Sequence, residues 1–278
     1  MATNLVIQGA DVQTPDLKHF AKLSGASAIE QIDSGAFRLR GGRPAAGIAE
    51  RAETLRLDYA FVPEERRLAD FGLLVMDMDS TLITMETVDE LADMVGLKQE
   101  VAAITAQAMR GEIEYDESLR KRVELLKGLE ESALQRVYDE RLKLSPGAEV
   151  LLRKTQALGL RTLLVSGGFT YVTDRLKTRL KLDHCHSNLL EISDGKLTGQ
   201  VLGAIVNADG KREALLKVRD SLGITAREIV GIGDGANDLK FLAECGVSVA
   251  FHAKPIVRAE ATHAINYVGL DGVLHLFN

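Results

Sequence analysis

The chain has 278 residues, of which 46% are hydrophobic and 27% charged, and its formal net charge is −6 at pH 7. A chain of this length forms one large domain or roughly two to three small ones, with ample apolar core. The basic residues form no block and aromatic residues make up only 5% of the chain, so neither charge nor base stacking indicates a nucleic-acid partner.

The sequence also shows neither a membrane-spanning pattern nor a secretory signal pattern. No apolar run approaches the roughly 20 residues that a membrane helix needs. The N-terminus lacks the basic start and long apolar stretch of a secretory signal. The two cysteines, Cys185 and Cys245, do not make a disulfide framework. We therefore expect a cytoplasmic protein with no membrane partner.

Residues 1–68 have the pattern of a separate small domain. The sequence predicts strands over residues 5–8, 26–32, 36–39 and 57–62. A first helix is expected to follow Thr14 as its N-cap and to end at Gly25, and a second helix is expected to start at Pro44. The resulting order β-α-β-β-α-β predicts a ferredoxin-like unit. The polar residues 64–70 are expected to be a linker.

From residue 72 onward, strand and helix patterns alternate, which is typical of a doubly wound α/β sheet. The expected strands cover residues 73–76, 161–165, 229–233, 247–251 and 264–268. Residues 85–144 show only amphipathic helix patterns, so we predict a helical cap inserted into a core of residues 72–84 and 145–278. A second insertion, residues 188–201, is predicted to be a hairpin that turns at Asp194-Gly195.

The first chemical stretch lies at the end of the expected strand 73–76. Asp77 and Asp79 follow an unbroken apolar run, as in a strand buried on both faces, and such strands present ligand sites at their carboxyl ends. Residues i and i+2 of an extended chain share a face. Two neighbouring carboxylates repel each other unless a cation or a proton separates them. Hard oxygen ligands favour Mg²⁺. The competing interpretation is an exposed turn after a strand.

Two later stretches supply groups that suit a phosphate. Ser166-Gly167-Gly168 joins an expected strand to a helix start, where glycine lets the backbone approach a ligand and free N–H groups favour an anion. Lys211 lies at another helix start, where the helix dipole disfavours a cation. Taken alone, Lys211 is better interpreted as a solvent-facing side chain; beside a phosphate it would supply a compensating charge.

The last stretch follows the expected strand 229–233. Asp234 comes at the strand end and can be a third carboxylate of a Mg²⁺ site. Asn237 can hold substrate, and Asp238 can orient Lys211 or a metal-bound water. Simple capping of a helix N-terminus is a credible alternative for Asn237 and Asp238, but it explains Asp234 less well.

Together these features resemble the haloacid dehalogenase superfamily. The pattern Asp77-x-Asp79-x-Thr81 is similar to that of its phosphotransferase branch. Further stretches resemble those of the phosphoserine phosphatase family: residues 77–82, 86–90, 118–123, 165–169, 194–199 and 233–238. The likeness covers about residues 72–270. The N-terminal pattern is similar to the ACT-type domains that relatives often carry.

The resemblance implies a role for each motif residue. Asp77 would be the nucleophile and Asp79 the general acid and base, with Thr81 in support. Mg²⁺ would be held by Asp77, the backbone carbonyl of Asp79 and Asp234. The phosphoryl oxygens would be gripped by Ser166, the Gly167 amide and Lys211, with Asn237 holding substrate and Asp238 in support.

Two cap residues would recognise the rest of the substrate. Glu86 would pair with an ammonium group, and Arg122 with a carboxylate, which a guanidinium binds through two hydrogen bonds. From the sequence alone, Arg122 is better interpreted as a solvated helix residue, and Glu86 as an acid at a helix start.

The implied substrate is the small phosphate ester O-phospho-L-serine, with Mg²⁺ as cofactor. A homodimer and an amino-acid effector at the N-terminal domain are both left open. Two other functions also stay open: phosphotransfer or hydrolysis involving another small phosphate ester, and an amino-acid-sensing protein with an inactive core.

Overall fold

The structure, a computed structural model, describes residues 2–278. The chain forms two compact units. The first comprises the chain up to Leu74 together with Ser145–Arg161 and Ile224–Asn278, and the second comprises Val75–Leu144 and Thr162–Gly223. Within the described residues, every helix is too short or too polar to cross a lipid bilayer.

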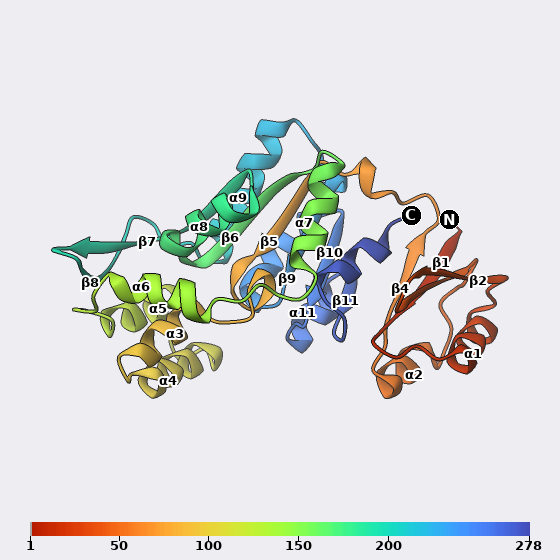
Figure 1. Cartoon of the computed structure of the whole chain (residues 1–278), viewed down its shortest axis with the longest axis horizontal. Helices are drawn as coiled ribbons and strands as arrows, with labels where there is room; N and C mark the ends of the chain where they lie inside the picture. Colours follow the sequence, from red (N-terminus) through yellow and green to blue (C-terminus); the bar gives the residue numbers. More distant parts are fainter. Residues whose placement is uncertain (1) are drawn as a thin grey trace. The chain divides into compact units, whose positions relative to one another are not determined.

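The first unit begins with a four-stranded antiparallel sheet covered by two helices (Figure 1). Its strands are β1 (Thr3–Gln8), β2 (Ala28–Asp33), β3 (Ala36–Arg40) and β4 (Asp58–Pro63), in the order β2-β3-β1-β4. Helices α1 (Thr14–Ser24) and α2 (Ile48–Leu55) complete the layer. Leu5, Phe20 and Ile48, from one strand and both helices, share a buried core. The predicted ferredoxin-like order is confirmed.

Both helices of this domain start differently from the prediction. The N-cap of α1 is Gln13, and Thr14 is already helical, so the assignment of Thr14 as the N-cap was wrong. The predicted start of the second helix at Pro44 was also wrong. Gly47 has a φ of 84°, which a right-handed helix does not accept, so α2 begins only after it.

The first unit also contains three parallel strands. These are β9 (Ile229–Gly233), β10 (Val247–Phe251) and β11 (His263–Ile265), and β10 pairs with the other two. The helices around them are α7 (Ala148–Ala157), α10 (Leu239–Leu242) and α11 (Pro255–Glu260), with short 3-10 helices at Leu68–Asp70, Ala226–Glu228, Ala236–Asp238 and Leu270–Leu276. Every residue of β9 and β10 is buried, as the apolar runs predict.

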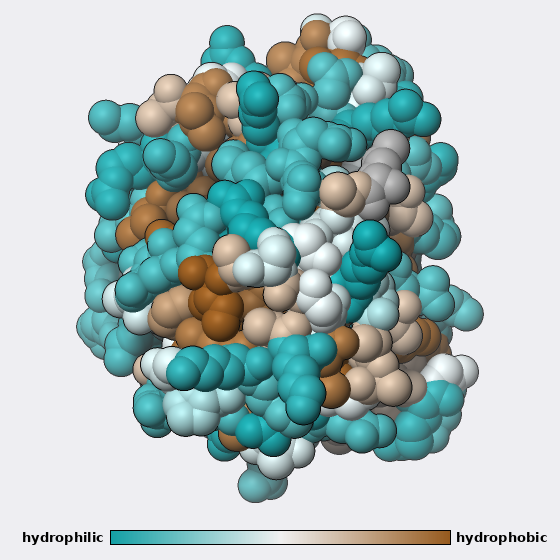
Figure 2. All heavy atoms as spheres, turned by 90° about the vertical axis from the view of Figure 1, so that its right-hand side faces the viewer, coloured by the Kyte–Doolittle hydropathy of each residue, from teal (hydrophilic) through white to brown (hydrophobic). Residues whose placement is uncertain are grey.

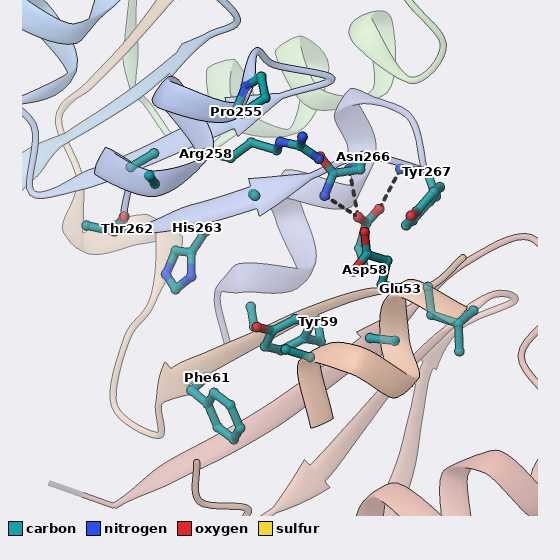
Figure 3. Close-up of a pocket in the computed structure, with 17 residues that line it drawn as sticks. Glu53, Asp58, Tyr59, Phe61, Pro255, Arg258, Thr262, His263, Asn266 and Tyr267 are labelled. Carbon is teal, nitrogen blue, oxygen red and sulfur yellow. Dashed lines mark hydrogen bonds between the residues drawn. The ribbon is translucent and has the colours of Figure 1, made fainter. Parts of the chain in front are cut away.

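Strand β11 is shorter than the expected strand 264–268, because the next backbone groups bind a side chain instead of a sheet. The Asp58 carboxylate of β4 accepts hydrogen bonds from the backbone N–H groups of Asn266, Tyr267 and Val268, at 2.6, 2.9 and 3.1 Å (Figure 3). Burial raises the pKa of Asp58, and these N–H groups oppose that rise. Asp58 therefore anchors the N-terminal sheet to the segment after β11.

A cavity of about 620 Å³ lies beside this anchor. Tyr59 and Phe61 line it from β4, and Arg258 and His263 line it from the other wall (Figure 3). Because Asp58 already accepts bonds from three backbone donors, we interpret its carboxylate as structural.

Other polar contacts reinforce the same attachment. The Arg38 guanidinium donates to the carbonyl oxygen of Phe277 at 2.6 Å, and His275 Nδ1 lies 2.6 Å from Gln8 Oε1.

The molecular face seen in Figure 2 is mainly hydrophilic, with separate hydrophobic patches. Scattered apolar residues of this kind are normal on a protein surface and need no partner to explain them.

The second unit contains the strands that carry most of the predicted site. They are β6 (Arg161–Phe169), β7 (His184–Ser193) and β8 (Lys196–Leu202), together with the end of β5 (Leu73–Asp77). These strands lie in the order β5-β6-β7-β8. Strand β6 pairs parallel to β7, and β7 pairs antiparallel to β8. Helices α8 (Thr170–Leu180) and α9 (Ala208–Leu222) complete the core of this unit.

The hairpin β7–β8 confirms one prediction and extends it. Asp194 and Gly195 have φ angles of 51° and 73°, as a type I′ turn requires. The sequence predicts no hairpin strand before Asn188, whereas β7 starts at His184 and pairs with β6 from there. The first residues of β7 are mostly polar, so they lack the apolar pattern from which a strand is predicted.

The insertion is helical throughout its named elements. These are α3 (Thr87–Met94), α4 (Lys98–Met109), α5 (Tyr115–Glu124), α6 (Ser132–Arg136) and a short π-helical turn at Val137–Arg141 (Figure 1). Leu119, Val123 and Leu126 are buried, as expected for the apolar side of an amphipathic helix pattern. The two ends of the insertion are joined by an antiparallel bridge between Ile83 and Leu144.

Candidate active site

Strand β5 delivers Asp77 to the start of a tight turn. Every residue of the strand is buried, and Asp77 is only 5% exposed. The Met78 N–H donates to Asp77 Oδ1 at 2.7 Å. The turn that follows, Met78–Leu82, contains Ser80 at a φ of 56° and includes the fully buried Thr81. The competing interpretation of an exposed turn is therefore wrong for Asp77.

Lys211 comes to Asp77 from the first turn of α9. The Asn207 side chain caps that helix by accepting hydrogen bonds from the N–H groups of Asp209 and Gly210. Lys211 is 1% exposed, and its Nζ lies 2.7 Å from Asp77 Oδ1. Two charges taken out of water are tolerated only when they are well paired. The solvent-facing alternative for Lys211 is thus contradicted.

Asp79 has an environment that suits a proton donor. Its Oδ1 accepts from the Thr87 hydroxyl at 2.6 Å and from the Thr87 N–H at 3.3 Å. Burial, followed by the negative charge of Glu86, raises the pKa of Asp79 to about 8, although the Thr87 bonds and Lys211 oppose this rise. A carboxyl group with such a pKa carries a proton at neutral pH and can act as a general acid.

The turn Ser166-Gly167-Gly168 lies within the end of β6, where the pairing with β7 shifts register. Ser166 Oγ accepts from the Gly168 N–H at 2.8 Å, so its own hydrogen stays available for an oxygen ligand. The Asn188 side chain donates to the Gly167 carbonyl and accepts from the Val206 N–H, both at 2.8 Å. Asn188, which the sequence analysis missed, thus holds the turn in place.

The two predicted recognition residues lie on the cap helices. Glu86 is the N-cap of α3, but it makes no capping bond, and its Oε1 instead accepts from the Ser80 hydroxyl at 2.7 Å. The structure thus places Glu86 at a helix start, as its alternative interpretation expects, with its carboxylate bound to Ser80. Arg122 is half-buried in α5, with its Nε 3.3 Å from the Ser118 carbonyl oxygen.

Tyr115, at the start of α5, was not singled out from the sequence. A Cβ atom placed on Gly167 would lie 2.0 Å from the Tyr115 hydroxyl, so this ring covers the glycine turn closely. Burial raises the pKa of Tyr115 to about 12, which keeps the phenol neutral. An isolated aromatic residue at a helix start gives no signal that distinguishes such a position from ordinary cap packing.

The loop after β9 in the first unit carries Asp234. Asp238 is fully buried, and its Oδ2 accepts from the N–H groups of Asp234 and Gly235 at 3.1 and 3.0 Å. Asp238 therefore fixes the backbone from which the Asp234 side chain extends. Asn237 is half-buried in the short 3-10 helix of this loop.

Two acidic side chains of the first unit lie close together. Carboxylate oxygens of Asp234 and Asp238 lie within 4.8 Å of each other. Such an all-oxygen, all-carboxylate donor set fits a hard divalent cation. The Asp79 carboxyl is not a member of this pair, and the sequence analysis assigned only its backbone carbonyl to the metal.

Comparison with known proteins agrees with this geometry. Residues 74–243 match the model of the haloacid dehalogenase-like hydrolases. The chain belongs to this family. Residues 5–48 also match a domain of unknown function, DUF4072. The family assignment, together with the relatives below, makes the chain a phosphoric monoester hydrolase.

Three similar proteins illustrate the family relationship. A phosphoserine phosphatase from Polaromonas sp. is 52% identical over 215 residues, which are 76% of this chain and 91% of that protein. The unliganded structure of a probable phosphoserine phosphatase from Vibrio cholerae has a TM-score of 0.87 and 38% identity, covering 99% of this chain and 86% of that one. A phospho-aspartyl intermediate analogue of phosphoserine phosphatase has a TM-score of 0.70 and 37% identity, covering 75% and 99% of the two chains.

Proposed function

We propose that the protein hydrolyses O-phospho-L-serine to L-serine and phosphate, the last step of L-serine biosynthesis, in the cytoplasm. The observation that carries this proposal is the buried pair of Asp77 and Lys211, 2.7 Å apart, in a chain whose relatives are named phosphoserine phosphatases. A buried carboxylate held by a cation is a suitable nucleophile for phosphorus, because Lys211 can also neutralise an incoming phosphoryl group.

In the proposed first step, an oxygen of Asp77 attacks phosphorus and forms an aspartyl-phosphate. The bond from phosphorus to the seryl oxygen breaks, and the proton on Asp79 moves to that oxygen, which releases serine. In the second step water attacks the phosphorus, Asp79 takes the proton of that water, and Asp77 is restored as phosphate leaves. The raised pKa of Asp79 suits it both to donate a proton in the first step and to accept one from water in the second.

Other residues of the chain are proposed to hold the substrate. The Ser166 hydroxyl, the Gly167 N–H and Lys211 would donate to the phosphoryl oxygens, in which charge is spread during transfer. Glu86 would bind the ammonium group and Arg122 the carboxylate. Asn237 would complete the contacts. The covalent step is supported by likeness to the phospho-aspartyl intermediate analogue of phosphoserine phosphatase, which is 37% identical to this chain.

Mg²⁺ is the proposed cofactor. Asp77, Asp234 and the backbone carbonyl of Asp79 would hold it, as the family resemblance implies, and Asp238 would support Asp234 through the loop backbone. A divalent cation bound there would polarise the phosphoryl group and offset the charge of the carboxylates.

The proposal is tested by measuring phosphate release from O-phospho-L-serine, O-phospho-L-threonine, sugar phosphates and aryl phosphates. Each substrate is assayed after treatment with EDTA and again after MgCl₂ is added. We expect preferred, Mg²⁺-dependent hydrolysis of O-phospho-L-serine, abolished by Asp77→Asn. Phosphate release that prefers another ester, or phosphate recovered mainly on an added hydroxyl acceptor, would contradict the proposal. Turnover that survives Asp77→Asn would refute the covalent mechanism.

A further inference from the structure

The two carboxylate oxygens of Asp79 face different surroundings. Oδ1 accepts both hydrogen bonds from Thr87, at 2.6 Å from the hydroxyl and 3.3 Å from the backbone nitrogen. Oδ2 lies on the side of the phosphate-binding turn. A Cβ atom placed on Gly168 would sit 3.1 Å from this oxygen and 3.0 Å from Ser166 Oγ. Turning a protonated carboxyl by half a turn would place its O–H against the Thr87 hydroxyl in place of the acceptor oxygen.

The Thr87 hydroxyl donates to Asp79 from a buried, fixed position. Thr87 is fully buried at the first position of α3, the first cap helix, so its side chain has no water to bind in place of Asp79. A hydroxyl has one hydrogen to donate, and here that hydrogen goes to Oδ1. Oδ1 is thereby occupied as an acceptor, which leaves Oδ2, beside Ser166 and Gly168, as the oxygen free to carry a proton.

We propose that Thr87 is a positioning residue, which holds Asp79 so that Oδ2 and its proton face the oxygen of the departing group. This inference rests on the proposed function and assigns to Thr87 no proton transfer of its own. When the phosphorus–oxygen bond breaks, the bonding electron pair stays on the leaving oxygen and takes the proton from Oδ2. Thr87 keeps its hydrogen throughout, because its bond to Oδ1 only sets the direction of the carboxyl.

This role makes a prediction that depends on the leaving group. A serine alkoxide is a poor leaving group and needs its proton during bond cleavage, whereas 2,4-dinitrophenolate departs without one. Positioned proton transfer contributes about 10²–10⁴-fold to a rate. Loss of the Thr87 hydroxyl should therefore slow cleavage of the alkyl ester and spare cleavage of the activated aryl ester.

The experiment compares wild type with Thr87→Val, which removes the hydroxyl while keeping the shape, and with Thr87→Ser, which restores it. Thr155→Val is the matched control, because Thr155 is 1% exposed and its hydroxyl bonds to backbone carbonyls within α7. For each protein, kcat/KM is measured for O-phospho-L-serine and for 2,4-dinitrophenyl phosphate. This parameter reports the steps up to release of the leaving group. Thermal unfolding verifies that each variant is folded, and Thr87→Ala replaces Thr87→Val if the latter does not fold.

We expect Thr87→Val to lower kcat/KM for O-phospho-L-serine by about 10²-fold, to leave that for the aryl ester within a few-fold, and Thr87→Ser to recover most of the loss. Equal losses on both substrates would show that Thr87 only supports the structure, and unchanged values on both would show that it has no role; either result overturns the inference. If the wild-type protein does not hydrolyse O-phospho-L-serine, the proposed function itself is refuted. That result is obtained without any variant, so it is distinct from failure of the Thr87 inference.

Discussion

Lys211 Nζ lies 2.7 Å from Asp77 Oδ1, and both side chains are almost completely removed from solvent. A buried ion pair contributes little net stability, because the loss of hydration offsets the attraction between the charges. The pair is therefore better explained by chemistry than by folding. It places the cation of Lys211 beside a carboxylate at the point where a phosphoryl group is proposed to arrive.

The first prediction concerns the separate and joint removal of these two charges. Lys211→Met should lower kcat by about 10²–10³-fold, the usual effect of losing one stabilising group at a developing charge. It should also destabilise the protein by about 3–5 kcal/mol, because Asp77 is left buried without its partner. The double variant Asp77→Asn/Lys211→Met should regain most of this stability and stay inactive. Urea unfolding in EDTA and phosphate release provide the two measurements.

Either of two results would contradict this account. A Lys211→Met variant with normal turnover would remove Lys211 from the site. A double variant no more stable than Lys211→Met would show that the loss came from packing of the lysine stem and not from the unpaired charge.

The second prediction assigns Arg122 to the carboxylate of the substrate. Arg122→Ala should lower kcat/KM for O-phospho-L-serine by about 10–100-fold, since a hydrogen bond to a charged group contributes about 1.5–3 kcal/mol. Phenyl phosphate has no carboxylate, so its hydrolysis should change little. Arg120→Ala is the matched control, because Arg120 is an exposed arginine on the same helix. Equal losses on both substrates would exclude Arg122 from recognition.

The buried strand that carries the nucleophile could be predicted from the sequence because burial alone determines its pattern. Leu73–Met76 is an apolar run that ends in acids, and the structure buries all of β5. The ferredoxin-like order was predictable because its strands have regular patterns and Gly25 marks the end of a helix. Lys211 was not predictable in isolation, because its burial depends on Asp77, which lies far away in the sequence.

Three supporting features escaped the sequence analysis because they depend on hydrogen bonds across the fold. Thr87 binds Asp79, and Asn188 joins the Gly167 carbonyl to the Val206 N–H. A buried threonine or asparagine has no sequence signature until its partner is known. The early end of β11 has the same origin, since Asp58, from the distant strand β4, takes the N–H groups that would have extended the strand.

The third prediction concerns Asp238, whose carboxylate shapes the loop of Asp234. An asparagine amide at this position can accept both backbone N–H bonds with its oxygen, but it has no negative charge and its NH₂ group cannot act as an acceptor. Asp238→Asn should therefore raise the Mg²⁺ concentration for half-maximal activity by about 10-fold or more, as loss of supporting groups does at metal sites. The exposed Asp220→Asn variant controls for net charge. Isothermal titration with MgCl₂ gives a second readout, and unchanged affinity in Asp238→Asn would contradict the role.

The fourth prediction is a pH dependence of stability that originates at His263. Burial, followed by the nearby positive charge of Arg66, lowers the pKa of His263 from 6.5 to about 4. In the folded protein the neutral ring lies with Nε2 2.7 Å from the Arg66 guanidinium, from which it can accept a hydrogen bond. The unfolded chain binds a proton at His263 below pH 6.5, whereas the folded protein does not until about pH 4.

The unfolded state thus takes up more protons in this window, so the free energy of unfolding should fall as the pH drops from 6.5 towards 4. The contribution of His263 reaches about 3 kcal/mol at the lower end. His263→Gln retains an acceptor for Arg66 but does not titrate, so its unfolding free energy should fall less steeply over the same range. His19→Gln, at an exposed histidine, should follow the wild type. Urea unfolding of the three proteins at a series of pH values measures the difference, and parallel curves for wild type and His263→Gln would show that His263 is not buried in its neutral form.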